Sequence, residues 1–285
     1  MKLASFFHGG KASFGAVQGD AIVDLGRRTG YRSLFAALSA DALDELRQAA
    51  SAAPADHRLA DVTLQLPMPD APNYFCVGRN YKGHVAEVAG KLPEFPSMFI
   101  RLPSSMAATA EPIIRPEVSG EFDFEGELAL VIGTAGRHIK KQEALSHIAG
   151  YSILMDGSVR DYQFRHCLTV GKNFWRTGSF GPWIVTADEI GDPTQLELHT
   201  RLNGSEVQCA RTDDFIFDIP HIIEYISTFT KLMPGDIIAT GTPEGVGFAR
   251  QPPLWLQPGD TLEVEIAKIG FLRNTVIAEP AAHRG

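Results

Sequence analysis

Cysteine is scarce in this chain: the 285 residues include only Cys76, Cys167 and Cys209. An odd number at wide spacing fits neither a disulfide framework nor a zinc site built from paired CxxC motifs. A reducing compartment is the simpler interpretation, and we expect a cytoplasmic protein. The first apolar run is too short for a signal peptide before Gly9 and Gly10 interrupt it. No segment reaches the ~20 apolar residues of a membrane span, which makes a membrane partner unexpected.

Basic residues are also in the minority, with 26 Lys and Arg against 34 Asp and Glu and a formal net charge of −8. No basic field is available to attract phosphates, so we expect no nucleic-acid partner. The hydrophobic share of 44% and the charged share of 21% are typical of a globular chain with an ordinary core. The 27 glycines and 18 prolines have no collagen-like period and therefore predict many turns and much β structure.

Prolines and a change in charge divide the chain into two expected domains. A small N-terminal domain over 1–70 opens with a hairpin around the turn at 8–11 and continues into a short helix within 38–53. The proline-rich stretch 51–72 is typical of a connector, because proline removes a donor and restricts the residue before it. Residues 71–285 form the second domain and carry most of the excess negative charge.

The second domain is predicted to be α+β and dominated by strands. Helices are expected over 141–149 and 219–231, the latter from isoleucines at helical spacing. The pair Asn203-Gly204 is typical of a two-residue hairpin turn. The expected strands are 127–133, 151–155, 183–186, 196–202, 236–240, 262–267 and 271–277.

Four acidic residues alternate with apolar or small ones at Glu121, Asp123, Glu125 and Glu127. If the segment is extended, their carboxylates project from one face and repel one another unless a cation lies among them. Carboxylate oxygens select hard ions such as Mg²⁺, Mn²⁺ or Ca²⁺. Asp156, at the end of an apolar strand, offers a third ligand. The alternative is a solvated acidic strand face, which is how most such runs are used.

For the other candidate functional residues, an ordinary structural role is likewise an alternative to a catalytic or binding role. His84 and Glu87 lie one helical turn apart. They are either a general base with its orienting carboxylate or an ordinary surface pair. Lys172 stands among apolar and small residues, where its ammonium can stabilise an enolate or simply reach solvent. Arg160 can bind a substrate carboxylate or neutralise the acidic cluster. The glycine-rich stretch 240–247 can offer N–H groups to an anion, but it lacks nucleotide-binding spacing.

Taken together, these segments resemble the fumarylacetoacetate hydrolase superfamily over about 73–276. The resemblance rests on motifs that follow one another in the family's order. They are Gly-x-Asn-Tyr-x-x-His-x-x-Glu at 78–87, Asp-Phe-Glu-x-Glu-Leu at 123–128, Asp-x-Ser-x-Arg-Asp-x-Gln at 156–163, Gly-Lys-x-Phe at 171–174, Thr-x-Asp-x-Ile-Phe at 212–217, Pro-Gly-Asp at 234–236 and Thr-Gly-Thr-Pro-x-Gly-Val-Gly at 240–247.

The resemblance implies a mixed β-roll fold beside the small N-terminal α/β unit, and a homodimer. It implies Mg²⁺ or Mn²⁺ held by Glu125, Glu127 and Asp156, with Ca²⁺ as a non-physiological occupant. By the same match, His84 and Glu87 activate water.

The same comparison of motifs assigns the residues around the substrate. Lys172 is expected to act with the catalytic pair, and Arg160, Gln163, Thr242 and Tyr81 are expected to contact the substrate. The chain departs from the common pattern at Met155, Trp175 and Arg79, which leaves the shape of the substrate pocket open.

Family members act on 2-oxo acids and 1,3-diketo acids, so the resemblance implies a metal-dependent hydrolase that cleaves a C–C bond in an acylpyruvate. The alternative is a decarboxylase or enol–keto isomerase of 2-oxo acids from aromatic catabolism, of the oxaloacetate or 2-hydroxyhepta-2,4-diene-1,7-dioate type. A third interpretation is a non-catalytic binding module. The presence of both His84 and Glu87 argues against it, because a pure binder needs no oriented base.

Overall fold

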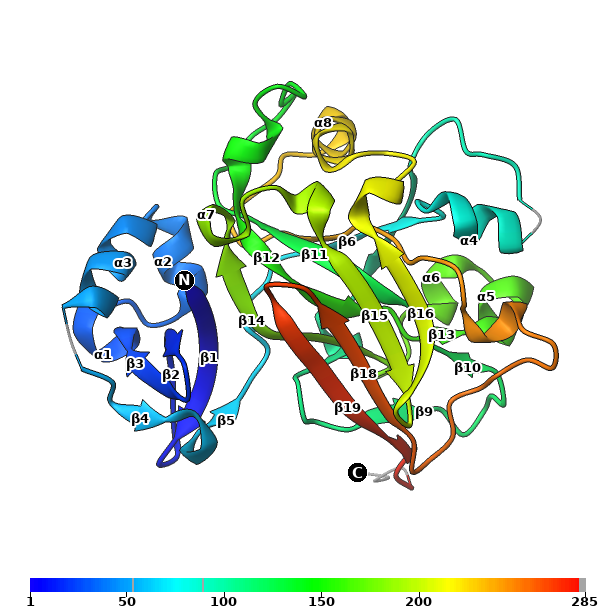
Figure 1. Ribbon diagram of the computed structural model, residues 1–285, viewed down its shortest axis with the longest axis horizontal. Coiled ribbons are helices and arrows are strands. Elements are labelled where there is room, and N and C mark those ends of the chain that lie inside the picture. Colours follow the sequence, from blue (N-terminus) through cyan, green and yellow to red (C-terminus); the bar gives the residue numbers. More distant parts are fainter. Residues whose placement is uncertain (53, 89, 282–285) are drawn as a thin grey trace.

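The N-terminal unit is an antiparallel meander covered by short helices, at the left of Figure 1. The computed structural model describes residues 1–52, 54–88 and 90–281. The predicted turn at 8–11 is confirmed, since His8 pairs with Lys11 across it. The elements of the unit are β1 (Lys2–His8), β2 (Lys11–Gln18), β3 (Ala21–Asp24), α1 (Leu25–Thr29), α2 (Leu34–Ser39), α3 (Leu43–Ser51), β4 (His57–Arg58) and β5 (Thr63–Leu64).

The short helix expected within 38–53 is confirmed as α3, although residues 38 and 39 belong to the separate helix α2. The chain turns between α2 and α3 at Asp41, whose φ of 56° lies in the left-handed region that ends a helix. Ala53, the last residue of that prediction, lies outside the described residues.

A large mixed sheet joins the N-terminal unit to the rest of the chain. Its strand order is β4-β3-β2-β1-β14-β12-β11-β17-β6-β7, and β1 pairs with β14 through Lys2 and Leu3. The strands not yet bounded are β6 (Tyr74–Gly78), β7 (Ser97–Arg101), β8 (Met106–Ala107), β11 (Gly126–Ile132), β12 (Ile148–Met155), β14 (Gly178–Thr186) and β17 (Ile237–Ala239).

A second sheet, of order β16-β15-β18-β19-β9, packs against one face of the first. Its strands are β9 (Ile113–Arg115), β15 (Glu197–Leu202), β16 (Ser205–Arg211), β18 (Thr261–Ile266) and β19 (Gly270–Ala278). The short pair of β10 (Phe122–Asp123) and β13 (Ser158–Val159) stands apart from both sheets. The remaining helices are α4 (Lys82–Glu87), α5 (Arg160–Arg165), α6 (Leu168–Gly171), α7 (Ala187–Ile190) and α8 (Ile219–Phe229).

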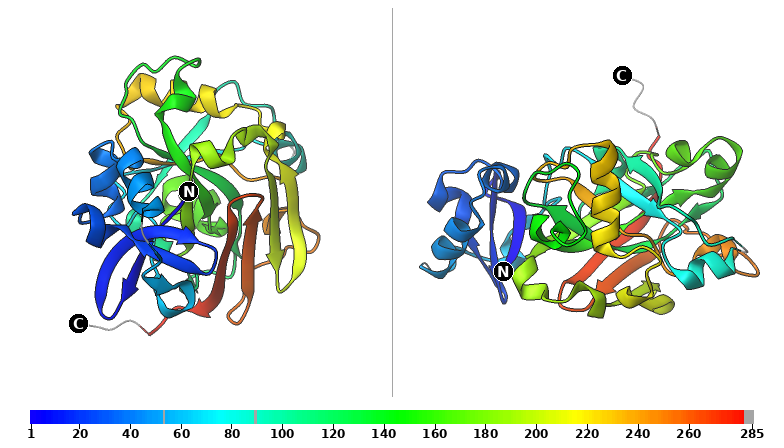
Figure 2. Two further views of the ribbon diagram at one scale, coloured as in Figure 1. Left: turned by 60° about the vertical axis from the view of Figure 1, so that its left-hand side comes forward. Right: turned by 90° about the horizontal axis from the view of Figure 1, so that it is seen from above.

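The two largest parts of the core lie on opposite faces of the central strand β11, which is buried on both. Leu128 and Leu130 face the second sheet and α8, whereas Ala129 and Val131 face the helices of the N-terminal unit. Burial on both faces explains why residues 128–132 of this strand form a continuous apolar run without alternation. Figure 2 shows α8 lying across the main body, well away from the N-terminal unit.

The fold is a β-dominated α+β arrangement, as predicted, and all seven expected strands are present. The type of the Asn203-Gly204 turn is also confirmed, since both residues have positive φ, at 52° and 82°. The helix predicted over 141–149 is wrong. Only a 3₁₀ turn forms at Ala144–His147, and β12 begins at Ile148, where pairing with Ile132 of β11 takes the last two residues of the predicted helix into the sheet.

The acidic run does not form one extended strand with a single acidic face. Asp123 ends β10, which pairs with β13, whereas Glu127 belongs to β11, which pairs with β12. The chain leaves one ladder and enters another at Phe124 and Glu125, so the carboxylates separate into two environments.

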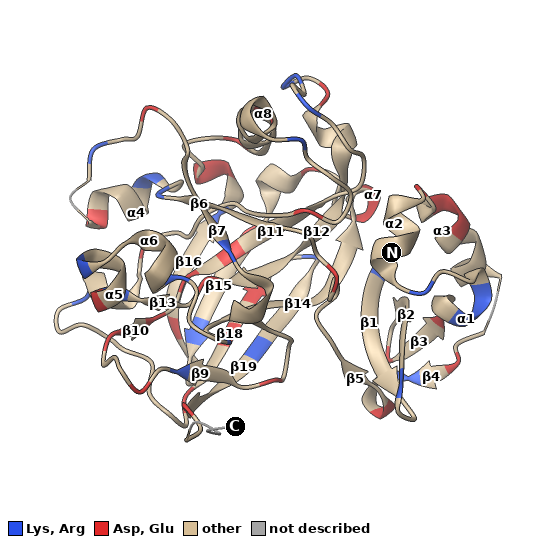
Figure 3. Cartoon of the chain, turned by 180° about the vertical axis from the view of Figure 1, so that it is seen from behind, with Lys and Arg blue, Asp and Glu red and all other residues tan. Residues whose placement is uncertain are grey.

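Charged residues of both signs are interspersed over both units (Figure 3). Among the described residues, no helix combines the length and the apolar character that a bilayer crossing requires.

Candidate active site

Three buried carboxylates meet where β10, β11 and β12 end or begin. Glu125 precedes β11, Glu127 is its second residue, and Asp156 follows the last residue of β12. One carboxylate oxygen from each lies within 4.8 Å of the others, and the three side chains are buried. The backbone N–H of Asp156 donates to the carbonyl of Glu125 at 2.8 Å, which fixes the two ligand segments side by side. The structure thus brings together the three residues that the sequence predicted as metal ligands.

Buried cations surround this triad. The Lys172 ammonium, at the end of α6, donates to Glu125 Oε2 at 2.7 Å and to Asp156 Oδ2 at 2.6 Å. Arg101, on β7, binds the other oxygen of Asp156 and also donates to the carbonyl of Gly157 at 2.9 Å. The sequence analysis missed Arg101, because an arginine in a strand carries no motif that marks it as the partner of a distant aspartate.

The electrostatic balance differs between the two glutamates. Burial works against ionisation at Glu125, but the charges of Lys172 and Arg160 outweigh it and hold the pKa of Glu125 well below its usual value. Burial, together with the charges of Asp156 and Glu125, raises the pKa of Glu127 well above its usual value. Without a further cation in the cluster, Glu127 therefore favours its protonated form.

A divalent cation fits this cluster. All three donors are carboxylate oxygens, the type that Mg²⁺ and Mn²⁺ prefer, and a cation among them would remove the repulsion that falls on Glu127.

Arg160 neutralises the acidic cluster. Its Nε donates to Asp123 Oδ2 at 2.7 Å, and its Nη2 lies 2.6 Å from Glu125 Oε1. A further bond from Nη1 to Gln163 Oε1, of 3.0 Å, holds the first turn of α5 against the site. One face of the guanidinium stacks on the ring of Phe248 at 4.4 Å. The sequence left two roles open for Arg160, which were binding a substrate carboxylate and neutralising the acidic cluster. The geometry shows the second.

His84 and Glu87 are oriented as a pair on α4. His84 Nδ1 lies 2.8 Å from Glu87 Oε1, and the imidazole is almost fully buried. Asn80 fixes the entry into α4, since its side chain donates to the carbonyls of Phe217 and Thr240 and accepts from the N–H of Phe217. With Nδ1 engaged by the carboxylate, Nε2 is the ring nitrogen left for proton transfer.

The glycine-rich loop at 240–247 offers its N–H groups to anions, as the sequence suggested, but these anions are the chain's own carboxylates. Gly241 N–H donates to Glu127 Oε2 at 2.8 Å, Gly245 N–H to Glu87 Oε2 at 2.9 Å, and Gly247 N–H to Asp123 Oδ1 at 2.7 Å. A single loop therefore positions a metal-ligand candidate, the partner of the histidine and the partner of Arg160.

A cavity of about 380 Å³ opens onto these groups. Its polar lining includes the sequence-predicted residues His84, Glu125, Glu127, Arg160, Gln163, Lys172 and Thr242. The apolar part of the wall includes Phe99, Phe164 and Phe248. Thr242 uses its hydroxyl within the protein, donating to the carbonyl of Gly126 at 3.0 Å and accepting from Gln208 at 2.9 Å.

Glu87, Asp156 and Tyr81 do not line this cavity in the described residues. Glu87 and Asp156 lie directly behind residues that do. Tyr81 is fully buried and packs edge to face against Phe215, with ring centroids 4.8 Å apart. Burial and the charge of Glu127 raise the pKa of its hydroxyl. Its predicted contact with substrate stays a prediction.

Arg79 also lines the cavity, and the sequence analysis did not place it there. Its φ of 56° is unusual for a residue with a side chain and costs roughly 1 kcal/mol. In the described part of the chain, its guanidinium has no ion pair and no hydrogen bond. One signal in the sequence could have pointed to Arg79: it stands directly before Asn80, at a position where the chain departs from the common family pattern.

The chain is similar in sequence to a known protein family. Residues 73–277 match the family model described as fumarylacetoacetate (FAA) hydrolase C-terminal. The chain is 39% identical to the oxaloacetate tautomerase YisK of Bacillus subtilis, over 77% of this chain and 75% of that protein.

Two solved structures cover nearly the whole chain. The 5-carboxymethyl-2-hydroxymuconate delta-isomerase of Mycobacterium smegmatis has a TM-score of 0.80 at 30% identity, covering 99% of this chain and 100% of that one. The maleylpyruvate hydrolase of Sphingobium sp. SYK-6, in complex with manganese(II) and pyruvate, has a TM-score of 0.83 at 30% identity, covering 98% and 100%.

Proposed function

The chain belongs to the fumarylacetoacetate hydrolase superfamily and is an enzyme of that family, and on this premise we propose that it is a divalent-metal-dependent tautomerase or isomerase of 2-oxo acids. The observation that carries the proposal is the His84–Glu87 pair, whose histidine lines the same cavity as Glu125 and Glu127 of the acidic triad. The sequence analysis put C–C hydrolysis first. Similarity to an oxaloacetate tautomerase and to an isomerase supports its alternative better.

We assign the metal to Glu125, Glu127 and Asp156. A divalent ion bound there supplies Lewis-acid polarisation of the substrate's oxygens. The manganese in the similar maleylpyruvate hydrolase supports Mn²⁺, and the all-oxygen donor set is equally suited to Mg²⁺.

Proton transfer falls to His84. For a keto acid going to its enol, Nε2 accepts the proton from C3, the C3–H electron pair becomes the C2–C3 double bond, and the carbonyl pair moves to oxygen. The imidazolium then returns its proton to that oxygen, and the reverse order converts enol to keto. Glu87 holds Nδ1–H and stabilises the charged ring. Lys172, whose ammonium also lines the cavity, stabilises the negative oxygen.

The remaining polar residues orient the substrate. Arg160, Gln163 and Thr242 line the cavity and are proposed to face the 2-oxo-acid end. Arg79 also lines the cavity, and its guanidinium has no protein partner among the described residues. Such a group is suited to binding a second carboxylate of the substrate. We therefore expect dicarboxylic 2-oxo acids, such as oxaloacetate, to be better substrates than monocarboxylic ones.

Hydrolysis is the second candidate, favoured by the same pair of residues and by the likeness to a maleylpyruvate hydrolase. His84 would take a proton from water, and the hydroxide would add to the distal carbonyl of an acylpyruvate. The C–C bond would then break, leaving its electron pair on pyruvate as the enolate, which Lys172 would stabilise before protonation.

A panel of substrates distinguishes these reactions. Chelator-treated protein is assayed with Mg²⁺ or Mn²⁺ on enol-oxaloacetate, on 2-hydroxydienoates and on short acylpyruvates, with products identified by NMR. We expect double-bond migration without C–C scission, and a large loss in His84→Ala. Pyruvate and a free carboxylic acid as the products of acylpyruvates would establish the second candidate. Release of CO₂ from oxaloacetate would identify a decarboxylase. The homodimer and the cytoplasmic location stay predictions.

A further inference from the structure

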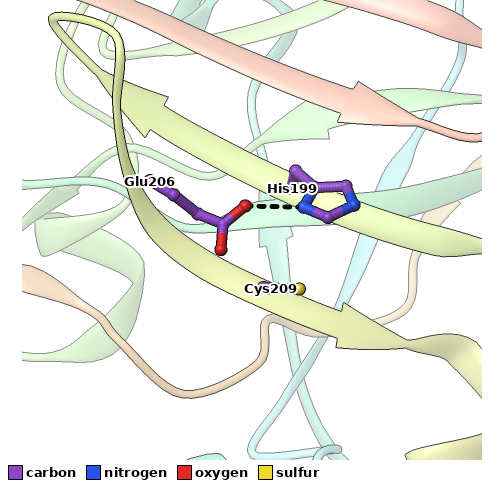
Figure 4. A group of neighbouring side chains, drawn as sticks. All are labelled: His199, Glu206 and Cys209. Carbon is purple, nitrogen blue, oxygen red and sulfur yellow. Dashed lines mark hydrogen bonds and ion pairs between the residues drawn. The ribbon is translucent and has the colours of Figure 1, made fainter.

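A second group of metal-ligating side chains lies on the hairpin of β15 and β16, outside the acidic triad (Figure 4). His199 Nδ1 is 2.8 Å from Glu206 Oε2, and one donor atom from each of His199, Glu206 and Cys209 lies within 4.8 Å of the others. The cysteine thiol is free and exposed. Of the two potential metal clusters in the described residues, this one contains nitrogen and sulfur donors.

The register of the hairpin creates the group. His199 pairs with Cys209 across the two strands, so both side chains leave the same face of the sheet. Glu206 is three residues before Cys209 and in a regular strand would point to the opposite face. The ladder pairs Thr200 with Gln208 but Arg201 with Glu206, so Val207 is an extra residue that turns Glu206 back to the face of Cys209.

This bulge is held firmly. The carbonyl of Val207 accepts a hydrogen bond from Arg250 Nη2 at 2.5 Å, and a Cβ on Gly245 would lie 2.2 Å from the same oxygen. The strand β15 also pairs with β18 along its length, on the side away from β16. The three side chains therefore stand on a fixed backbone, and only their own rotamers need to adjust around an ion.

Charge on this face also suits a cation. The carboxylate of Glu206 lies within the group itself, and its Oε2 is 2.8 Å from His199 Nδ1. The nearest outward cation on β15, Arg201, is engaged by Glu265 at 2.7 Å.

We propose that His199, Glu206 and Cys209 form a binding site for a borderline-soft divalent ion of the Zn²⁺ class, with solvent in the fourth position. Zinc takes imidazole, thiolate and carboxylate ligands at about 2.0–2.3 Å in a tetrahedron, which puts donor atoms roughly 3.3–3.8 Å apart. The observed separations reach this geometry by rotation of exposed side chains. Binding releases the thiol proton. The all-oxygen triad selects harder ions, so the chain presents two metal sites of different chemistry.

Cobalt(II) separates the two sites, because only a thiolate ligand gives a sulfur-to-cobalt charge-transfer band in the near ultraviolet. Protein saturated with Mg²⁺ is titrated with Co²⁺, and affinity for Zn²⁺ is then measured by competition against a chromophoric chelator. We expect one charge-transfer site per chain in the wild type. The matched variant Cys167→Ser removes the other exposed thiol and should keep the band. Cys209→Ser should abolish it, and His199→Gln should weaken Zn²⁺ binding about 100-fold.

The absence of a charge-transfer band in the wild type, or its persistence in Cys209→Ser, overturns the proposal. Unchanged Zn²⁺ affinity in His199→Gln does so as well, since it would leave the thiol acting alone. Equal thermal midpoints of the four metal-free proteins verify that the fold is intact. The test does not depend on the reaction catalysed, so its failure would leave the proposed function untouched.

Discussion

The main-chain N–H of Gly245 donates a 2.9 Å hydrogen bond to Glu87, whose second oxygen holds the imidazole of His84. The loop lies 158 residues from Glu87 along the chain, yet through this carboxylate it sets the orientation of the His84 ring. A carboxylate fixed at both oxygens has little freedom, so the ring keeps one tautomer and one direction.

The catalytic pair should behave as one unit. His84→Ala should lower kcat by about 10²- to 10⁴-fold, because no other described group replaces its proton transfer. Glu87→Gln should cost less, and the double variant should be no worse than His84→Ala alone, because Glu87 acts through the histidine. The measurement is kcat and KM for the best substrate of the panel. Additive losses in the double variant would contradict the shared role.

Metal binding should stabilise the folded protein through the triad. Addition of Mn²⁺ to chelator-treated protein at a hundred times its Kd should add about 2.7 kcal/mol to the free energy of unfolding. Glu127→Gln should lose most of this gain and nearly all activity. Glu121→Gln is the matched control, because Glu121 belongs to the same acidic run but lies outside the triad. Thermal scans with and without the ion give the result, and an equal gain in Glu127→Gln would refute the assignment.

Lys172 should be essential to stability in the absence of metal. It is the shared partner of Glu125 and Asp156, so Lys172→Met leaves two buried carboxylates without an ammonium and should cost about 3–5 kcal/mol. Lys82→Met, which removes an exposed partner 3.5 Å from Asp214, should cost less than about 1 kcal/mol. Urea unfolding of chelator-treated proteins compares them. We expect Mn²⁺ to recover part of the loss in Lys172→Met, since it supplies positive charge to the same oxygens.

Arg79 should decide between dicarboxylic and monocarboxylic substrates. A hydrogen bond to a charged group contributes about 1.5–3 kcal/mol, so Arg79→Leu should raise KM for oxaloacetate about 10- to 100-fold. KM for a monocarboxylic 2-oxo acid of similar size should change little. Arg165→Leu provides the control, because Arg165 is exposed on α5 and does not line the cavity. An equal effect on both substrate classes would assign Arg79 to general attraction instead.

The glycine-rich loop should tolerate no side chain at Gly247. A Cβ there would lie 2.0 Å from the carbonyl oxygen of Leu254 and 2.5 Å from Asp123 Oδ1. We expect Gly247→Ala to cost about 1–3 kcal/mol of stability and to lower activity by displacing Asp123 from Arg160. Gly120→Ala, with no atom nearer than 3.8 Å, should be neutral. The two are compared by unfolding and by kcat.

Much of the fold and part of the candidate site could be predicted from the sequence. Alternation and turn residues predicted the strands and the Asn203-Gly204 hairpin, because these follow from local backbone preference and the period of burial. The order of motifs predicted the family and the gathering of Glu125, Glu127 and Asp156, since each of these candidate ligands lies in a segment with a characteristic pattern.

Tertiary structure decided the rest, because it depends on which distant segments pair. The helix expected at 141–149 does not form, because Ile148 and Ala149 belong to β12 and only a 3₁₀ turn precedes them. Arg101 reaches Asp156 only because β7 and β12 belong to one sheet. The His199 and Cys209 side chains meet through cross-strand register, and one extra residue at Val207 brings Glu206 to them. Spacing along the chain carries no record of such contacts, since register and bulges are set by the packing of whole sheets.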